Sequence, residues 1–347
     1  MSFPTCRYDT VPQTVGGARH QVRSSAADLR PTSKDRPPAP SDDRAIGRSP
    51  RRSPPSRARS RRSAPTRASV ASSTSATSKN GSSRCDTSYF EARLADFQRF
   101  EDPLVYTPGD NEWTDCHRAN NGGYLPTERL DTIRRLFFAE PGETLGQDPA
   151  EVRFQSRAFP ENVSWRTSGV HFGTVHVVGS NDDQAPWYGD RKDATGAPLP
   201  ETTAETALRG REYTAREGAA LAWIDRIFDE AEERGAPAVV IGMQADMWDG
   251  PTAEQSAFIA IKAVLADRAA RFAKPVLLLE GDSHELTIDT PPGQPANLTR
   301  IVVQGSTSVP HEWVRLKVDP ATPTVFSCEI VVFGSGAISP CAAPLAP

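Results

Sequence analysis

A dense group of polar side chains follows a short apolar run in the segment VYTPGDNEWTDCHR, residues 105–118. The apolar run 104–106 predicts a buried strand, and a Pro-Gly pair then turns the chain. Asp110, Asn111 and Glu112 come directly after this turn. Carboxylate and amide groups at this density, where a buried strand ends, are typical of a binding or catalytic site.

Two later predicted strands end in the same way. Gln244 closes the apolar run 237–244, and Asp282 and His284 lie at the end of the run 275–284. In open α/β sheets ligands gather at the carboxyl ends of the strands. We therefore expect the three polar groups to converge on one crevice, although each alone is also typical of turns and helix caps.

The chemistry of these side chains suits a metal centre. Carboxylates, an imidazole and amides are ligands for divalent ions such as Mn, Fe, Zn or Mg. Two such ions about 4 Å apart form a clamp for in-line displacement at phosphorus. The residues thus indicate metal-assisted chemistry on a phosphate ester.

Strands alternate with helices through most of the chain, which predicts an α/β fold. Apolar periodicity predicts helices at 88–100, 126–138, 205–234 and 253–272. Alternating or continuous apolar runs predict strands at 103–107, 168–183 (a hairpin strand and a long buried strand), 237–244, 275–284, 299–304, 313–318 and 325–333. The strand-rich end predicts a second, partly antiparallel sheet.

The beginning of the chain differs in composition from the rest. Residues 1–84 contain 15 Arg and 2 Lys against 5 Asp and no Glu, a net charge of +12 in a chain whose total is −4. They are rich in Ser, Pro and Ala, so they cannot bury enough surface to offset chain entropy. We therefore expect a disordered basic segment 1–87, a folded domain 88–335 and a flexible tail 336–347.

Two of these polar segments resemble segments of a known protein family. PGDNEW is similar to the GNHE segment of the calcineurin-like metallophosphoesterases, and EGDSH to their closing GHxH segment. The resemblance covers roughly 88–335 and is nearest to a bacterial branch that carries GDNEWTDC. It implies a two-sheet α/β/β/α sandwich, a two-metal centre at the strand ends and a small phosphate-ester substrate.

The resemblance also assigns roles to single residues. Asp110 takes the place of a metal-bridging asparagine, and Gln244 falls where a metal-binding histidine would be. Asp282 and His284 stand in the closing segment as metal ligands. Asn111 occupies the position of the catalytic histidine, but an amide cannot protonate a leaving group, so its role is to donate a hydrogen bond to a phosphoryl oxygen.

One further residue is a candidate for the site. Asn181 follows the apolar run VHVVG and either faces the substrate or forms a turn.

The early metal ligands of the family have no counterpart in this sequence. The family supplies them from a D-x-H-like turn and a GD, both upstream of Ser88, where residues 69–85 read SVASSTSATSKNGSSRC. A family-like stretch VHVGDI, read one base out of frame, gives STSATS, which stands at 73–78. We interpret much of 1–78 as a frameshift product, with an authentic basic tail as the alternative. The sandwich would then lack two central strands and at least two carboxylate ligands at its N-terminal side, so the chain would bind metal weakly if at all and could be inactive in this form.

Two other functions stay open on the sequence. The segment 281–283 (Gly-Asp-Ser) is similar to the GDS segment of GDSL-type serine esterases, although that family places it early and closes with D-x-x-H, where Ser308 precedes His311 here. A non-catalytic protein whose basic tail contacts nucleic acid is disfavoured, because the tail has no interleaved aromatics and the remainder of the chain is acidic.

Cysteines and hydropathy bear on the compartment. Cys85 and Cys116 flank the first helix-strand unit and either pair or stay free. No apolar run is long enough to span a bilayer, and the first 30 residues lack a signal-peptide core. We expect no membrane partner and, by default, a cytoplasmic protein, whereas a Cys85–Cys116 bridge would favour export.

Overall fold

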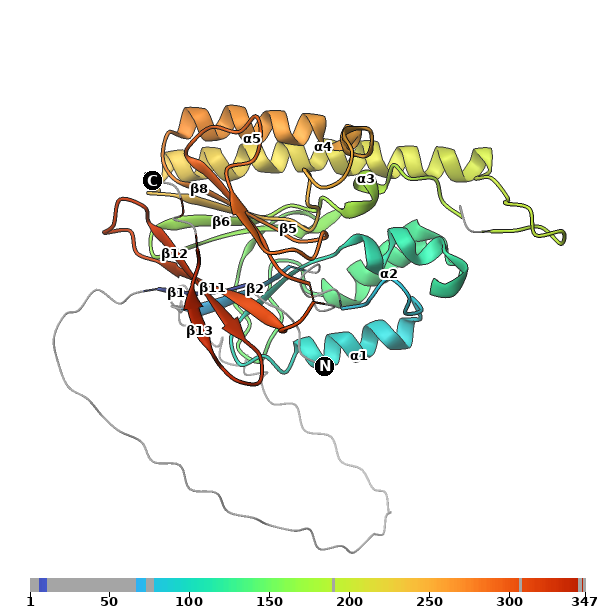
Figure 1. Ribbon diagram of the computed structural model, residues 1–347, viewed down its shortest axis with the longest axis horizontal. Coiled ribbons are helices and arrows are strands. Elements are labelled where there is room, and N and C mark those ends of the chain that lie inside the picture. Colours follow the sequence, from blue (N-terminus) through green and yellow to red (C-terminus); the bar gives the residue numbers. More distant parts are fainter. Residues whose placement is uncertain are drawn as a thin grey trace, which may run out of the picture. The chain divides into compact units, whose positions relative to one another are not determined.

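Two β-sheets form the centre of the fold (Figure 1). The computed structural model describes residues 6–10, 67–72, 78–188, 191–305, 308–342 and 345, with only the backbone described at 6–10, 67–72 and 253–254. All of them belong to one unit of the chain, residues 1–11 and 64–347.

The larger sheet has seven strands in the order β4-β5-β6-β7-β8-β10-β9. Its central strands are parallel: β6 (Val170–Thr174), β7 (Val239–Gly242), β8 (Val276–Glu280) and β10 (Leu298–Val302). The edges are antiparallel: β4 (Arg153–Ser156), β5 (Phe159–Thr167) and β9 (Thr287–Asp289). Parallel strands are covered on both faces, which explains why β7 and β8 read as continuous apolar runs.

The second sheet has six strands in the order β13-β12-β11-β1-β2-β3. Their bounds are β1 (Cys6–Thr10), β2 (Arg67–Ser72), β3 (Leu104–Thr107), β11 (Glu312–Val318), β12 (Phe326–Val332) and β13 (Ile338–Pro340). β11, β12 and β13 pair antiparallel. β1 runs parallel to β11 and antiparallel to β2, which is parallel to β3.

β1 and β2 correct two expectations about the N-terminal side. Both strands lie inside the segment 1–87, for which we expected disorder, and they fill the interval between β11 and β3 where we expected strands to be missing. Backbone hydrogen bonds require no aliphatic side chains, so the sequence RASVAS can pair on both sides although its composition is not typical of a strand. Residues 11–66 and 73–77 lie outside the described residues, and the frameshift stays a hypothesis.

The folded part also extends beyond both predicted boundaries. Ser78, Lys79 and Cys85 are buried, although folding was expected to begin near Ser88. At the other end, the tail expected to be flexible contains β13, and Cys341 forms a disulfide with Cys328 on β12. No spacing pattern in the sequence indicated this second bridge.

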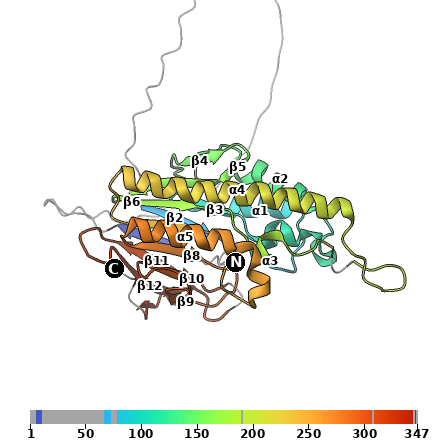
Figure 2. The same ribbon diagram turned by 90° about the horizontal axis from the view of Figure 1, so that it is seen from above.

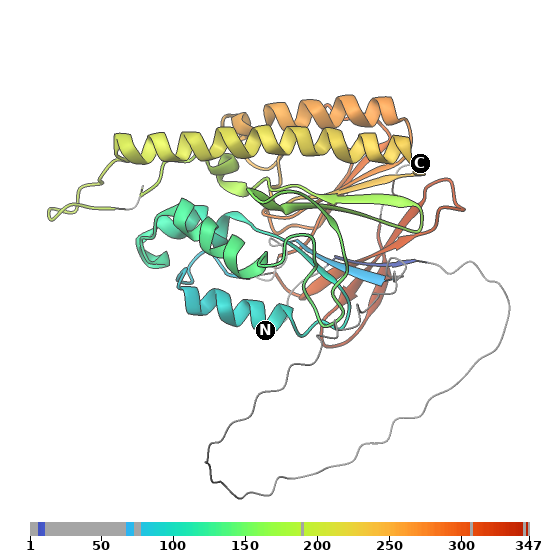
Figure 3. The ribbon, with the colours of Figure 1, turned by 180° about the vertical axis from the view of Figure 1, so that it is seen from behind.

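Three clusters of buried apolar side chains define the layers. One lies between the sheets and joins Phe172 and Val240 to Leu316. The second joins the outer face of the larger sheet to α4 (Thr203–Glu233) and α5 (Ile259–Phe272), which lie side by side in Figures 2 and 3. The third surrounds β3 and includes residues of α1 (Thr87–Phe97) and α2 (Pro126–Phe137). The chain is therefore an α/β protein built on two sheets.

Short helices connect the strands near the ends of β3, β6 and β7. They are η1 (Asp110–Glu112), η2 (Thr114–His117), η3 (Ala119–Asn121), α3 (Gly179–Asp183) and η4 (Thr252–Phe258). The predicted strand through 183 ends at Thr174, and β4, β5, β9 and β13 were not predicted. β5 was missed because buried Glu161 and Asn162 interrupt its apolar alternation. Among the described helices, none is both long and apolar enough to cross a membrane.

Candidate functional site

The segments that follow β3, β7 and β8 meet at one point, as the sequence predicted. Nε2 of the fully buried Gln244 donates a hydrogen bond to Oδ1 of Asp110 at 2.8 Å and to Oδ1 of Asp282 at 3.0 Å. One amide group therefore bridges carboxylates from two distant parts of the chain. The convergence of the three polar groups is confirmed.

The orientation of the Gln244 amide is fixed by the backbone. Its Oε1 accepts hydrogen bonds from the backbone N–H of Asp110 at 3.3 Å and of Gly179 at 2.5 Å. An N–H donor needs an oxygen acceptor, so Nε2 must face the two carboxylates. Gln244 thus presents a donor to the site, whereas the resemblance implied a metal ligand at this position.

Two further residues belong to the group, and neither was selected from the sequence as a site residue. Ser180 Oγ lies 3.3 Å from Asp110 Oδ2 and 3.4 Å from Asp115 Oδ1. Asp115 is on η2 and is buried, and its Oδ2 pairs with Arg118 at 2.7 Å. Asp115 stands in the polar segment after β3, so its position did carry a signal. We call Asp110, Asp115 and Asp282 the acidic cluster.

The acidic cluster holds its carboxyl groups in an unfavourable setting for negative charge. Burial is the main cause that raises the pKa of all three, and the charge of Asp110 raises the pKa of Asp115 and Asp282 further. The pKa of Asp115 reaches about 7. The nearby Lys79 is buried and has a lowered pKa, because burial outweighs the attraction of the carboxylates around it. A cation placed among these carboxylates would relieve their repulsion.

A left-handed turn carries Ser180 into the site. Residues 180–183 of α3 all have positive φ, at 55°, 52°, 51° and 64°, although none is glycine. Each such residue costs roughly 1–2 kcal/mol. The turn is held by Asp182, which accepts from the Val178 N–H at 3.0 Å and from Arg216. Backbone strain of this kind clusters at functional sites.

We considered two roles for Asn181, facing the substrate or forming a turn, and its contacts match the turn. Its Oδ1 accepts from the backbone N–H of Ala257 at 3.0 Å, and its Nδ2 donates to Ser256 Oγ at 3.1 Å. The side chain therefore joins α3 to η4. The structure places it there rather than with the Gln244 amide.

The loop after β8 is also in the left-handed region, at Asp282 (φ 67°) and His284 (φ 65°). A Cβ on Gly179 would lie 2.3 Å from Asp282 Oδ2, so only glycine allows the carboxylate to approach α3 so closely. A Cβ on Gly305 would similarly lie 2.3 Å from Cγ of His284. The imidazole of His284 is thus packed against Gly305, on the same loop as Asp282.

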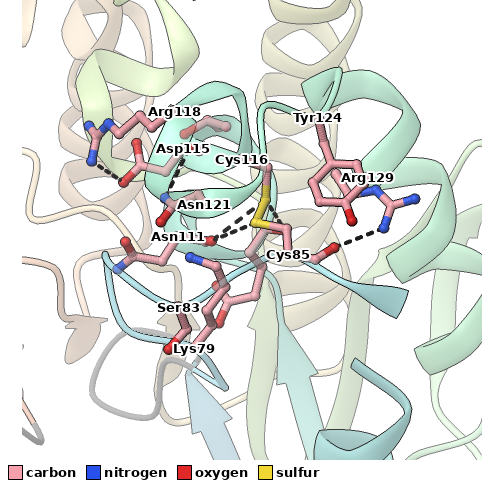
Figure 4. Close-up of a disulfide and its surroundings, with 12 residues drawn as sticks. Lys79, Ser83, Cys85, Asn111, Asp115, Cys116, Arg118, Asn121, Tyr124 and Arg129 are labelled. Carbon is pink, nitrogen blue, oxygen red and sulfur yellow. Dashed lines mark hydrogen bonds and ion pairs between the residues drawn. A yellow bond between two sulfur atoms is a disulfide. The ribbon is translucent and has the colours of Figure 1, made fainter. Parts of the chain in front are cut away.

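Asn111 lies on η1 at the edge of this group. Its backbone N–H donates to Asp110 Oδ1 at 2.8 Å, and its half-buried side chain approaches Gly81. Figure 4 shows Asn111 in the same neighbourhood as Lys79 and the disulfide between Cys85 and Cys116. The amide is therefore available near the acidic cluster, but it is not part of the Gln244 bridge.

The sequence left open whether Cys85 and Cys116 are paired or free, and in the structure they form a disulfide. The two Cα atoms are 5.8 Å apart, and the bridge ties the segment before α1 to η2, which carries Asp115. Arg129 also donates to the carbonyl oxygen of Cys85 at 2.8 Å. The position of Asp115 thus depends on a covalent link to the N-terminal side of α1.

Replacing Cys85 and Cys116 together by Ala is expected to lower the free energy of unfolding by about 3–4 kcal/mol. The bridge spans 31 residues, and opening a loop of that length releases this much chain entropy in the unfolded state. Urea unfolding of the oxidised proteins measures the loss. The matched variant, with Cys328 and Cys341 replaced, opens a 13-residue loop away from the acidic cluster. An unchanged unfolding free energy in the first variant would contradict the expectation.

Stability without added cations is expected to fall as the pH rises from about 5 to about 8. Burial raises the pKa of Asp115 to about 7 and of Glu112 to about 8. The unfolded chain loses these protons near pH 4, so the folded protein holds more protons between those values. The stability that these two groups contribute is therefore complete below about pH 4 and is lost by about pH 8.

The expected loss is several kcal/mol, because the pKa rises from 3.8 to about 7 for Asp115 and from 4.5 to about 8 for Glu112, and one pKa unit corresponds to about 1.4 kcal/mol. Urea unfolding in the presence of a chelator measures it. Asp115→Asn removes one of the two titrations and should make the decline shallower. A free energy of unfolding that rises over this pH range would show that the carboxyl groups are not buried as described.

Comparison with known proteins adds no identification. The chain matches no protein-family model, and no curated protein is significantly similar to it. Among the residues that the structure describes, no group of three or more His, Cys, Asp or Glu side chains has the arrangement of a metal site.

Proposed function

We propose that this protein is a metal-dependent, phosphoesterase-like hydrolase that acts on a small phosphate ester. The observation that carries the proposal is the pair of carboxylates, Asp110 and Asp282, that bracket a single point at the ends of β3 and β8. The two-sheet α/β architecture and the resemblance of PGDNEW and EGDSH to metallophosphoesterase segments support it. A sandwich of the metallophosphoesterase type is part of the same proposal.

The residues fit a hard or borderline divalent cation. Asp110 and Asp282 share one N–H donor, Gln244 Nε2, and an amide carries no net charge to offset two carboxylates. Asp110 and Asp282 would hold the ion, with Asp115 next to them and His284 on the loop of Asp282. These oxygen and nitrogen donors suit Mn, Fe, Zn or Mg. The aspartate that the family supplies early would fall within 73–77, outside the described residues.

The ion would supply charge to the phosphoryl group and acidify a water molecule. Within the chain itself, Asn111 donates from its amide to a phosphoryl oxygen, and buried Lys79 adds positive charge nearby. Ser180 holds Asp110 and Asp115 in place. Asn111 cannot give a proton to the leaving oxygen, whereas the carboxyl group of Asp115, whose pKa burial and the charge of Asp110 raise to about 7, can do so.

The serine-esterase alternative has a less suitable geometry. Ser283 Oγ donates to Asp246 Oδ2 at 2.9 Å, and the same carboxylate pairs with Arg300 at 2.8 Å. An ion-paired carboxylate is a weak base, so it would not activate the hydroxyl well.

Hydrolysis of p-nitrophenyl phosphate tests the proposal. We expect slow turnover that requires added Mn, Fe, Zn or Mg ions, stops on chelation and survives Ser283→Ala. Turnover that is insensitive to chelation but lost in Ser283→Ala would instead establish the esterase. A folded chain with no turnover in any of the four ions, even after residues 73–78 are replaced by VHVGDI, would overturn the proposal.

A further inference from the structure

A cavity of about 290 Å³ opens next to the acidic cluster. Asp115 and Ser180 line it. Ser180 also contacts Asp110, and Asp115 belongs to the acidic cluster, so the same two residues border both the cavity and the cluster. Its volume is at the small end of the range for ligand pockets. A molecule with one end at the acidic cluster would therefore have room here for a small second part.

Asp183 lines the cavity and has one carboxyl oxygen without a hydrogen-bond partner among the described residues. The residue is 1% exposed, and its Oδ1 accepts a hydrogen bond from Trp187 Nε1 at 2.8 Å. Its Oδ2 has no hydrogen-bond partner among the residues that the structure describes. A buried polar atom without a partner costs about 1–3 kcal/mol, which a ligand in the cavity would recover.

Two of the polar residues that line the cavity, Asp183 and Arg118, can donate hydrogen bonds to a ligand. Burial raises the pKa of Asp183 well above its ordinary value, which favours the protonated carboxyl, the form that donates a hydrogen bond. Arg118 also lines the cavity, is half-exposed and uses one guanidinium nitrogen for Asp115. A guanidinium has five N–H donors, so others can serve a ligand. The complementary ligand is small and rich in oxygen acceptors.

We propose that this cavity binds the alcohol part of the substrate, and that this alcohol is a small polyol that carries hydroxyl oxygens. The position of the phosphate at the acidic cluster rests on the function proposed above. Asp183 Oδ2 and Arg118 donate to the hydroxyl oxygens, and the wall shared through Ser180 sets the distance between the two ends of the ligand. The cavity thus selects among phosphate esters by the polarity of the leaving group.

Calorimetric titration with glycerol 1-phosphate and n-propyl phosphate tests this selection, because the two differ only by hydroxyl groups. We expect the wild-type chain to bind glycerol 1-phosphate at least about tenfold more tightly, since a site built around hydroxyl groups rejects an analogue without them. Asp183→Leu should abolish the preference. Asp183→Asn should retain it, because its carboxamide still accepts from Trp187 and donates to the ligand.

Because Asp183→Leu changes a buried residue and could disturb folding, a second variant tests the cavity at an exposed position. Ala185 is exposed and lines the cavity, so Ala185→Phe fills the space without removing a buried contact. It should weaken glycerol 1-phosphate binding at least tenfold while the unfolding transition stays unchanged. Equal binding of the two esters by the wild-type chain, or a preference that survives both Asp183→Leu and Ala185→Phe, would overturn the inference.

Turnover of p-nitrophenyl phosphate separates this inference from the proposed function. A preference for glycerol 1-phosphate without hydrolysis of any ester would remove the enzymatic proposal and leave the cavity assignment in place. Metal-dependent hydrolysis without the preference would remove the cavity assignment alone.

Discussion

Asp282→Asn is expected to make the cation-free protein more stable and to abolish the stabilisation that Mn²⁺ confers. The carboxylate is held against the charge of Asp110, which together with burial raises its pKa well above the ordinary value. An asparagine keeps an oxygen for the Gln244 hydrogen bond but removes the cost of ionising or protonating a buried carboxyl. The variant therefore loses a cost that a bound cation would offset in the wild-type chain.

The expected sizes are large enough to measure by thermal unfolding. An ion present at about 100 times its dissociation constant adds about 2.7 kcal/mol to the wild-type stability. For a folded part of this size that corresponds to a rise in Tm of about 5–10 °C. Asp282→Asn should show no rise, and its metal-dependent turnover should fall by at least about 1000-fold, because both a ligand and its charge are lost.

Asp131→Asn on the exposed face of α2 is the matched control, since it removes the same charge away from the site. It should leave the effect of Mn²⁺ on Tm intact. A wild-type response to Mn²⁺ that persists in Asp282→Asn would place the ion elsewhere. A cation-free Tm that falls in the variant would mean that Asp282 stabilises the fold through its charge.

The sequence was sufficient to find the place of the site, but not its internal geometry. Asp110, Gln244 and Asp282 each follow a strand, and strand ends in an α/β sheet meet at one edge, so their convergence could be predicted. The direction of the Gln244 amide could not, because the N–H of Gly179 fixes it and that residue is distant in sequence. Ser180 was missed because its role depends on a left-handed backbone that no local pattern indicates.

The same division applies to the fold. The long helices α1, α2, α4 and α5 and the central strands β7, β8 and β10 follow from apolar periodicity, because each buries its side chains in one of the three apolar clusters. β1 and β2 do not, because their backbone pairing is decided by neighbouring strands rather than by their own composition. The two disulfides depend on tertiary proximity, so only the bridge that flanks a local unit, Cys85–Cys116, could be anticipated as an alternative.

Replacing residues 73–78 by VHVGDI is expected to raise metal-dependent hydrolysis by about 100-fold or more. The replacement puts an aspartate directly before position 78. Ser78 is buried and donates to Glu112 Oε1 at 2.9 Å, and buried Lys79 interacts with Asp110 and Asp115. The replacement therefore adds a carboxylate one position before a described residue of this neighbourhood. Even groups that only orient metal ligands are worth about 10–100-fold, so a direct ligand should contribute at least the upper value.

The control is the replacement VHVGNI, which differs only by an asparagine in place of that aspartate. Both replacements add aliphatic residues after β2 and both remove the Ser78 hydrogen bond to Glu112, so their difference isolates the carboxylate. Turnover of p-nitrophenyl phosphate in Mn²⁺ should rise with VHVGDI and not with VHVGNI. Equal gains would show that the aliphatic residues act by stabilising the sheet, and the missing-ligand hypothesis would then fail. No gain in either, with both proteins folded, would mean that the acidic cluster is already as complete as this chain can make it.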